Sequence, residues 1–143
     1  MDVAICAYDT EKEQLHFAGA NRPLWIHRGN EIIVYSRDRQ HIGFTSSPRA
    51  FTHHIIDIEQ GDTAYIFSDG ISDQFGGELG RRFTSKKIKN VLSKSSNLKL
   101  KQRVLRLEAE FLAWKEDSSQ TDDVCMLAVN FDNQKNHDKG HTT

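Results

Sequence analysis

The chain has 143 residues, of which 37% are hydrophobic and 27% are charged, and its formal net charge is −1. This length is that of one globular domain that buries a core of its own. The near-zero net charge gives no global reason to expect nucleic acid or an acidic membrane surface as a partner.

The two cysteines, Cys6 and Cys125, lie inside apolar runs. They are expected to be buried, reduced thiols, which fits a cytoplasmic protein without a disulfide framework. The N-terminus lacks the basic start and cleavage site of an export signal. No apolar run approaches membrane-spanning length, so no membrane contact by this chain is expected.

The first half of the chain predicts β-strands. Residues 3–8 are almost continuously apolar, which indicates a strand covered on both faces. The run Arg28-Gly29-Asn30-Glu31 predicts a tight hairpin. An antiparallel meander is favoured, with further strands expected at residues 15–18, 24–27, 32–35, 51–58 and 63–68.

The second half changes its hydrophobic period and predicts two helices. Ile88, Val91 and Leu92 form one apolar stripe, and a longer amphipathic helix is expected over about residues 98–116. The last strand, residues 124–131, is apolar throughout. Residues 132–143 are polar without periodicity, and we expect them to be a disordered tail.

Basic residues are concentrated in the same half of the chain. No acid lies between Glu78 and Glu108, whereas ten Lys and Arg residues do. Such a run is most often a solvated helix face, and docking of an acidic protein is the alternative. No aromatic-studded basic strand accompanies the charge, so nucleic-acid binding is not expected.

Two acidic motifs flank apolar strands at distant places in the chain. The strand that ends at Phe67-Ser68 runs into Asp69-Gly70, and Thr121-Asp122-Asp123 runs into the last strand. If the two strands are antiparallel neighbours, Asp69 and Asp122 emerge at the same end of one sheet. Gathered carboxylate oxygens are what a hard divalent cation requires, so this arrangement predicts a metal site.

Each motif also has a purely structural interpretation. Asp-Gly is a common tight-turn signal, and an Asp-Asp pair before a strand is often a solvated loop. Among the seven histidines, His137 and His141 are four residues apart, but they lie in the polar tail, where a solvated segment is the stronger explanation. A histidine metal site is therefore set aside. Ser68 and Ser72 are interpreted as loop hydrogen-bonding residues rather than nucleophiles.

Three blocks of the sequence together resemble one protein family. These are Phe17-Ala18-Gly19-Ala20-Asn21-Arg22-Pro23-Leu24-Trp25, the run from Gly61-Asp62-Thr63 through Phe67-Ser68-Asp69-Gly70-Ile71-Ser72-Asp73 to Gly77, and Gln120-Thr121-Asp122-Asp123-Val124. In this order they resemble the stage II sporulation protein E family of metal-dependent serine/threonine phosphatases. The resemblance implies an α+β fold with an antiparallel β-sandwich flanked by helices. It also implies a centre of two manganese or magnesium ions. These ions would polarise the phosphate group of a phosphoprotein and activate a water molecule to attack it.

The resemblance assigns roles to individual residues. Asp69 and Asp122 would be ligands of one metal ion, and no protein nucleophile is needed. Gly70, Asp73 and Asp123 match motif positions that would support the ligands through the backbone, an outer hydrogen bond or a turn. The implied partners are a phosphoserine or phosphothreonine regulatory protein, such as an anti-sigma-factor antagonist, and an upstream sensor module.

One part of the family pattern is absent. Family members carry an upstream Asp-x-x-Gly-His-Gly-like motif that supplies a bridging carboxylate, and this chain has none. Residues 1–131 are therefore expected to be the C-terminal portion of a phosphatase domain. Alone it should hold at most one ion weakly and should be inactive. Its exposed strand edges favour self-association or pairing with the missing N-terminal part.

Three hypotheses stay open on sequence alone. The first is a portion of a phosphatase whose complete domain is an enzyme. The second is a non-catalytic interaction module that binds a phosphoprotein regulator. The third is an unrelated β-rich domain in which Asp69-Gly70 is only a turn.

Overall fold

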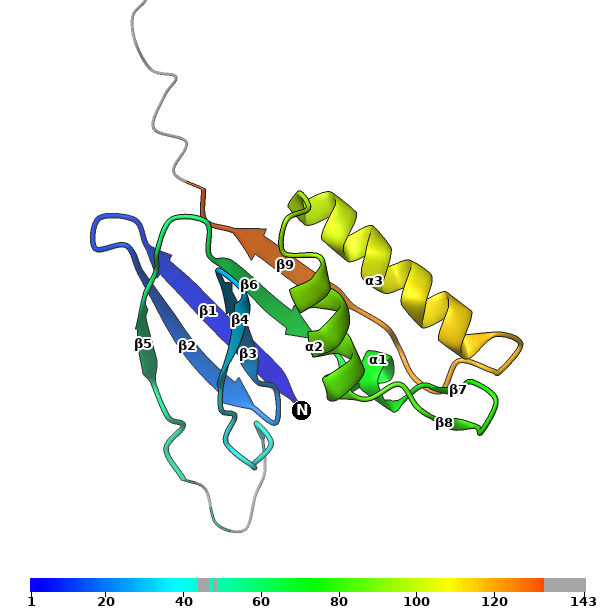
Figure 1. The fold of residues 1–143 in the computed structure, drawn as a ribbon. Helices are drawn as coiled ribbons and strands as arrows, with labels where there is room; N and C mark the ends of the chain where they lie inside the picture. The colour runs from blue at the N-terminus through cyan, green and yellow to red at the C-terminus, as the bar shows by residue number, and fades with distance from the viewer. Residues whose placement is uncertain (44–46, 48, 133–143) are drawn as a thin grey trace, which may run out of the picture.

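The computed structural model describes residues 1–43, 47 and 49–132, and it has the α+β architecture that the sequence predicts. Two antiparallel sheets pack face to face, and helices cover the outer face of one of them (Figure 1). The elements in chain order are β1 (Val3–Asp9), β2 (Gln14–Ala20), β3 (Leu24–Arg28), β4 (Glu31–Tyr35), β5 (His54–Asp57), β6 (Thr63–Phe67), α1 (Asp69–Asp73), β7 (Phe75–Gly76), β8 (Arg81–Arg82), α2 (Ser85–Lys94), α3 (Leu100–Lys115) and β9 (Met126–Asn130).

The first sheet has the strand order β1-β2-β5, and the second has the order β4-β3-β6-β9. The predicted Arg28–Glu31 hairpin joins β3 to β4, with Arg28 and Glu31 as its last cross-strand pair. The simple meander is wrong beyond the hairpins, because β5 crosses to the first sheet and β6 returns to the second. A small β7–β8 hairpin projects beside α1.

Successive side chains along the strands of the second sheet point to opposite faces, and each face packs in a separate hydrophobic core. In β6, Ala64 and Ile66 face the first sheet, whereas Tyr65 faces the helices. The core between the sheets is built from side chains of four strands and the turn after β5, namely Leu15, Phe17, Leu24, Ile26, Ile56, Ile58 and Ala64.

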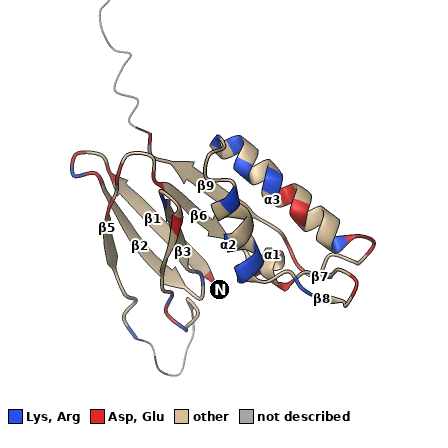
Figure 2. Ribbon diagram, viewed as in Figure 1, with Lys and Arg blue, Asp and Glu red and all other residues tan. Residues whose placement is uncertain are grey.

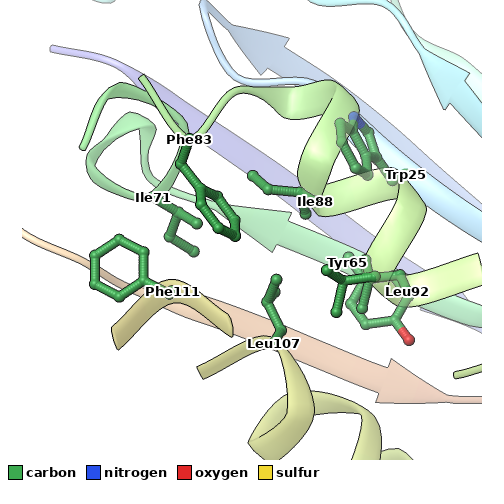
Figure 3. Packing of buried hydrophobic residues seen from close by; sticks show 9 residues of the cluster. Trp25, Tyr65, Ile71, Phe83, Ile88, Leu92, Leu107 and Phe111 are labelled. Carbon is green, nitrogen blue, oxygen red and sulfur yellow. The ribbon is translucent and has the colours of Figure 1, made fainter. Parts of the chain in front are cut away.

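The second core lies between the second sheet and the helices. The apolar stripe of α2, namely Ile88, Val91 and Leu92, packs against it as the helical period predicts. Figure 3 shows Leu107 and Phe111 of α3 approaching the same cluster from the other side. The remaining members are Trp25, Tyr65, Ile71 and Phe83.

Several sequence-based boundaries and burial predictions are wrong. The strand β1 is not covered on both faces, because Ile5 and Tyr8 are exposed. The ordered strand expected at residues 51–58 is confined to His54–Asp57, and the last strand begins at Met126. Cys6 is half-buried, and burial raises the pKa of its thiol to about 11. Cys125, however, is exposed. The predicted tail falls almost wholly on residues 133–143, outside the described part of the chain.

The sandwich is open along one side. Among the described residues, β1 pairs only with β2 and β9 pairs only with β6, so each presents a free strand edge. An apolar groove of about 530 Å³ lies between the two edges and reaches Leu15 and Ala64 in the inter-sheet core. The expectation of exposed strand edges is therefore confirmed for this side.

Eight of the 17 Lys and Arg residues in the described part of the chain lie on α2 and α3. Figure 2 shows Lys and Arg on α2 and on parts of α3. Lys87 lies with its ammonium 3.6 Å from the centroid of the Trp114 ring, a cation–π contact between α2 and α3. No helix within the described residues is both long and apolar enough to cross a membrane.

Candidate metal centre

The two predicted ligands lie at the same end of the second sheet. Strands β6 and β9 are antiparallel neighbours, and Phe67 is the cross-strand partner of Met126. Asp69 follows the end of β6 as the first residue of α1, and Asp122 lies in the segment that leads into β9. The chain therefore brings both acids to one rim of the sandwich, beside α1 (Figure 1). Their role as metal ligands remains a prediction.

Gly70 fixes how closely the two motifs approach each other. It is buried, and a Cβ atom built on it would lie 2.3 Å from the carbonyl oxygen of Asp123 and 3.1 Å from that of Asp122. Any larger residue would push the two segments apart. The glycine of the Asp-Gly motif is thus required by this contact, and its φ is not in the left-handed region that a tight turn would need.

Ser68 and Gln74 hold the segment before β9 in place. The Ser68 hydroxyl donates to the Asp123 carbonyl oxygen at 2.7 Å and accepts from the Cys125 amide at 3.0 Å. The fully buried Gln74 side chain donates to the Ser119 carbonyl and accepts from the Thr121 amide. These bonds clamp the segment on both sides of Asp122. The prediction that Ser68 is a loop hydrogen-bonding residue is confirmed, whereas Gln74 was missed.

Asp73 and Asp123 take different places around this rim. Asp73 ends α1 and forms an ion pair with Arg82 of β8 at 3.3 Å, so it is directed to the hairpin. Asp123 contributes its backbone, whose amide donates to Asp122 Oδ1 at 2.7 Å and whose carbonyl accepts from Ser68. Both contacts are compatible with supporting roles, which stay predictions.

Asp69 is already paired with a basic side chain. Its Oδ2 lies 3.0 Å from an Nη of Arg22, and 43% of its side-chain surface is exposed. The other carboxylate oxygen, Oδ1, has no ion-pair contact within the described residues. Asp122 is exposed, with Oδ1 bonded only to the next amide along the chain. Both acids therefore retain oxygen lone pairs for a further ligand.

The donor chemistry fits one hard cation but not a pair of ions. Carboxylate and carbonyl oxygens are the ligands that Mg²⁺ and Mn²⁺ prefer, and the Gly70 contact brings two carbonyls beside the two acids. Within residues 1–43, 47 and 49–132, however, no group of three His, Cys, Asp or Glu residues is placed to hold a metal ion. At this rim, Asp69 and Asp122 are therefore the two predicted carboxylate ligands, and a third metal-binding acid is absent from the described residues.

The histidines make one contact that the sequence did not predict. His16 of β2 and His53 stack, with Nδ1 of one 2.9 Å from Nε2 of the other. Residue 53 directly precedes β5, so the pairing arises across strands and is invisible to helical spacing. The two rings lie on the first sheet, which does not carry the acids, and no acid joins them in a metal-binding group within the described residues.

Comparison with protein families now gives the assignment. Residues 1–132 match the family described as stage II sporulation protein E (SpoIIE). The chain belongs to the SpoIIE family. The resemblance predicted from the three sequence blocks is therefore confirmed. Comparison with curated protein sequences gives no match.

Solved structures of SpoIIE-type and related phosphatases share this fold. The SiaA-PP2C domain of Pseudomonas aeruginosa is 27% identical, with a TM-score of 0.84 over 92% of this chain. The SpoIIE phosphatase domain of Bacillus subtilis, presoaked with Mn, is 19% identical, with a TM-score of 0.64 over 97% of this chain. RsbX in complex with magnesium is 17% identical, with a TM-score of 0.59 over 90% of this chain.

The chain spans little more than half the length of these structures. It covers 52% of the SiaA-PP2C chain, 59% of the Bacillus subtilis domain and 55% of RsbX. The open side between β1 and β9 is therefore found in a chain whose structural relatives contain a further segment of similar length. The family and the fold are those of PP2C-type phosphatases.

Proposed function

We propose that this chain is part of a metal-dependent serine/threonine protein phosphatase in which Asp69 and Asp122 bind one Mn²⁺ or Mg²⁺ ion. The observation that carries the proposal is the Gly70 contact, which joins the two acidic motifs at one rim of the sheet. Family membership supports the reaction class. The relatives that were prepared with Mn or with magnesium support the choice of metal.

Each residue at the rim then has a specific task. The carboxylates of Asp69 and Asp122 hold the ion, and Ser68 fixes the backbone of Asp123 beside it. Gly70 has no side chain, so the two segments can come into contact there. A divalent cation at this place supplies Lewis-acid polarisation of a phosphoryl oxygen and lowers the pKa of water. We assign no nucleophilic role to a side chain of this chain.

The described residues do not provide a complete two-ion centre. We propose that residues 1–131 form the C-terminal portion of the phosphatase domain and that the chain alone is inactive. The missing donors would come with a segment that packs on the open side, against β1 and β9. Exposed Leu127 and Val129, which line the groove on that side, support such a complement, because a monomer seldom leaves apolar edges uncovered.

The substrate class follows from the family assignment. We propose a phosphoserine or phosphothreonine on a regulatory protein, such as an anti-sigma-factor antagonist, and control by an upstream sensor module. We propose a cytoplasmic location on the basis of the same family assignment. The Lys and Arg residues on α2 and α3 are compatible with docking of an acidic regulator.

The test is reconstitution of phosphatase activity. The chain is mixed with the part of the SiaA-PP2C domain that lies outside its match, and Mn²⁺-dependent phosphate release from a phosphoserine peptide is measured. We expect activity that is lost in Asp69→Asn and in Asp122→Asn and kept in Arg82→Gln. Phosphate release that survives both Asp substitutions, or that persists after Mn²⁺ is chelated, would contradict the proposal.

A non-catalytic interaction module is the second candidate. The observation that favours it is the absence of a third metal-binding acid among the described residues. In that case a phosphoprotein regulator would bind with the same affinity to the natural chain and to Asp69→Asn. Calorimetric titration of the two proteins with the same phosphopeptide distinguishes the candidates.

A further inference from the structure

Arg22 lies between two carboxylates at the rim of the candidate metal centre. One Nη atom is 3.0 Å from Asp69 Oδ2, and the other is 3.4 Å from Asp2 Oδ2. Only 21% of the Arg22 side chain is exposed, and that of Asp2 is 26% exposed. The three side chains come from distant parts of the sequence: the N-terminus, the β2–β3 connection and the start of α1.

The β2–β3 connection is built to hold Arg22 at this place. A Cβ atom on Gly19 would lie 2.1 Å from the Arg22 carbonyl oxygen, so the chain closes tightly on itself there. Asn21 has a φ of 54°, a left-handed conformation that asparagine tolerates. Pro23 then restricts Arg22 to an extended backbone. The residue is therefore positioned by its turn and is not a free surface arginine.

Asp2 is in turn fixed independently of Arg22. Its Oδ1 accepts from the Asn21 side-chain amide at 3.0 Å and contacts His41 Nδ1. Oδ2 remains turned to Arg22. Asp2 therefore offers the guanidinium a second anionic partner that stays in place when Asp69 is engaged elsewhere.

We propose that Arg22 is an internal competitor of the divalent cation for Asp69. This inference rests on the proposed function of Asp69 and goes beyond it. In the metal-free protein the guanidinium neutralises Asp69. A cation that binds Asp69 competes with Arg22 even when it binds the free Oδ1, because two positive groups on one carboxylate repel each other and favour release of the guanidinium. The displaced guanidinium pairs with Asp2, so metal binding does not leave it without a counter-charge.

The arrangement makes metal affinity a property of the Arg22–Asp2 pair as well as of the ligands. Loss of the Arg22 charge removes the competitor and strengthens metal binding. Loss of the Asp2 charge removes the alternative partner and weakens metal binding, but only while Arg22 is present. This dependence separates competition from a general electrostatic effect of Asp2, which would act in both backgrounds.

Arg82 provides the matched control. It pairs with Asp73, at the other end of α1, at a distance of 3.3 Å, and both side chains are about half exposed. Arg82→Gln therefore removes the same charge from the same rim without touching Asp69. An effect of Arg22→Gln that Arg82→Gln lacks is specific to the Asp69 contact.

The experiment measures Mg²⁺ binding to the whole chain from the NMR shift of the Gly70 amide. We expect Arg22→Gln to bind Mg²⁺ about three- to tenfold more tightly than the natural chain. Arg22→Lys should fall between the two, and Arg82→Gln should match the natural chain. Asp2→Asn should weaken binding in the natural background and have much less effect beside Arg22→Gln.

The outcomes separate this inference from the proposed function. Equal or weaker Mg²⁺ binding in Arg22→Gln overturns the competition, while a Gly70 shift that is lost in Asp69→Asn still supports the metal site. An equal effect of Asp2→Asn in both backgrounds overturns the role of Asp2. If no variant responds to millimolar Mg²⁺, or if the shift persists in Asp69→Asn, the metal assignment fails and the competition fails with it.

Discussion

Asp62 and Asp69 lie at opposite ends of β6, and each pairs with an arginine, yet the two sites differ. Asp62 is only 1% exposed, and its carboxylate accepts from the Arg28 guanidinium at 2.6 to 3.2 Å and from the Glu59 amide at 2.9 Å. Hydrogen bonding to Asp62 raises the pKa of Arg28. Asp69 is 43% exposed and has one ion pair.

The comparison shows what distinguishes a structural acid at one end of β6 from a candidate ligand beyond its other end. The Asp62 carboxylate is saturated by protein donors, so a further cation would have to break a buried network. Asp69 keeps one oxygen free of ion pairs within the described residues and meets the exposed Asp122 segment across Gly70. Of the two acids, Asp69 is therefore the candidate ligand, because its carboxylate is not fully occupied by protein donors.

The largest effect on stability is expected at the saturated end. Asp62→Asn removes the buried carboxylate of this network and leaves the 30%-exposed Arg28 paired with Glu59. We expect the free energy of unfolding to fall by about 3 kcal/mol. Urea unfolding followed by circular dichroism measures the loss. A change below about 1 kcal/mol would show that the network is no tighter than an exposed ion pair.

A second comparison is between the closed, helix-covered core and the open side. Leu92 is fully buried, whereas Leu127 on β9 is 59% exposed. Leu92→Ala should cost about 3 kcal/mol of stability. The same substitution at Leu127 should cost less than about 0.5 kcal/mol in the isolated chain. Leu127→Ala should instead weaken binding of the complementary domain segment, and equal stability losses would contradict an open side.

A pH-dependent loss of stability is expected from His27. Both ring nitrogens and the Tyr65 hydroxyl lack hydrogen-bond partners within the described residues. Burial, with the nearby positive charge of Arg103, lowers the pKa of His27. The unfolded chain therefore takes up the proton first, at about pH 6.5. Stability is then complete above that pH and decreases below it.

The measurement for His27 is urea unfolding at about pH 7 and about pH 5.5. We expect the natural chain to lose more stability than His27→Leu over this interval. The other six histidines are present in both proteins, so they cancel in the difference. Identical pH dependence in the two proteins would contradict a neutral buried His27.

The smallest stability effect is expected at the candidate ligand. The Arg22–Asp69 pair is partly exposed, so Asp69→Asn should change the free energy of unfolding by less than about 0.5 kcal/mol. The same substitution should abolish metal binding. The contrast with Asp62→Asn, at the other end of β6, is the sharpest form of the comparison. A loss as large as that of Asp62→Asn would identify Asp69 as another structural acid.

Local patterns in the sequence were sufficient for much of the fold. The apolar stripe of α2 and the alternation along β6 predict these elements, and acids at the ends of two apolar strands predict where Asp69 and Asp122 meet. The covered β1 was predicted wrongly, because a continuous apolar run does not reveal whether both sides have a partner. The exposure of Ile5 depends on what packs beside the strand.

The supporting residues of the site could not be predicted, because their contacts are non-local. The Gly70 contact with Asp123 and the Gln74 bonds to residues 119–121 depend on how two loops meet. For Arg22, Gly19 and the run Asn21-Arg22-Pro23 in the sequence indicate a turn with a restricted backbone. Its partner was nevertheless 47 residues away, so only the fold reveals it.

The most direct test of the account is where Mn²⁺ binds. Paramagnetic broadening of backbone amides by substoichiometric Mn²⁺ reports distance to the ion in the whole chain. We predict broadening confined to the rim, at residues 68–73 and 121–125, with the Asp62 end of β6 unaffected and the effect lost in Asp69→Asn. Broadening centred on the His16–His53 pair, or none at the rim, would contradict the account.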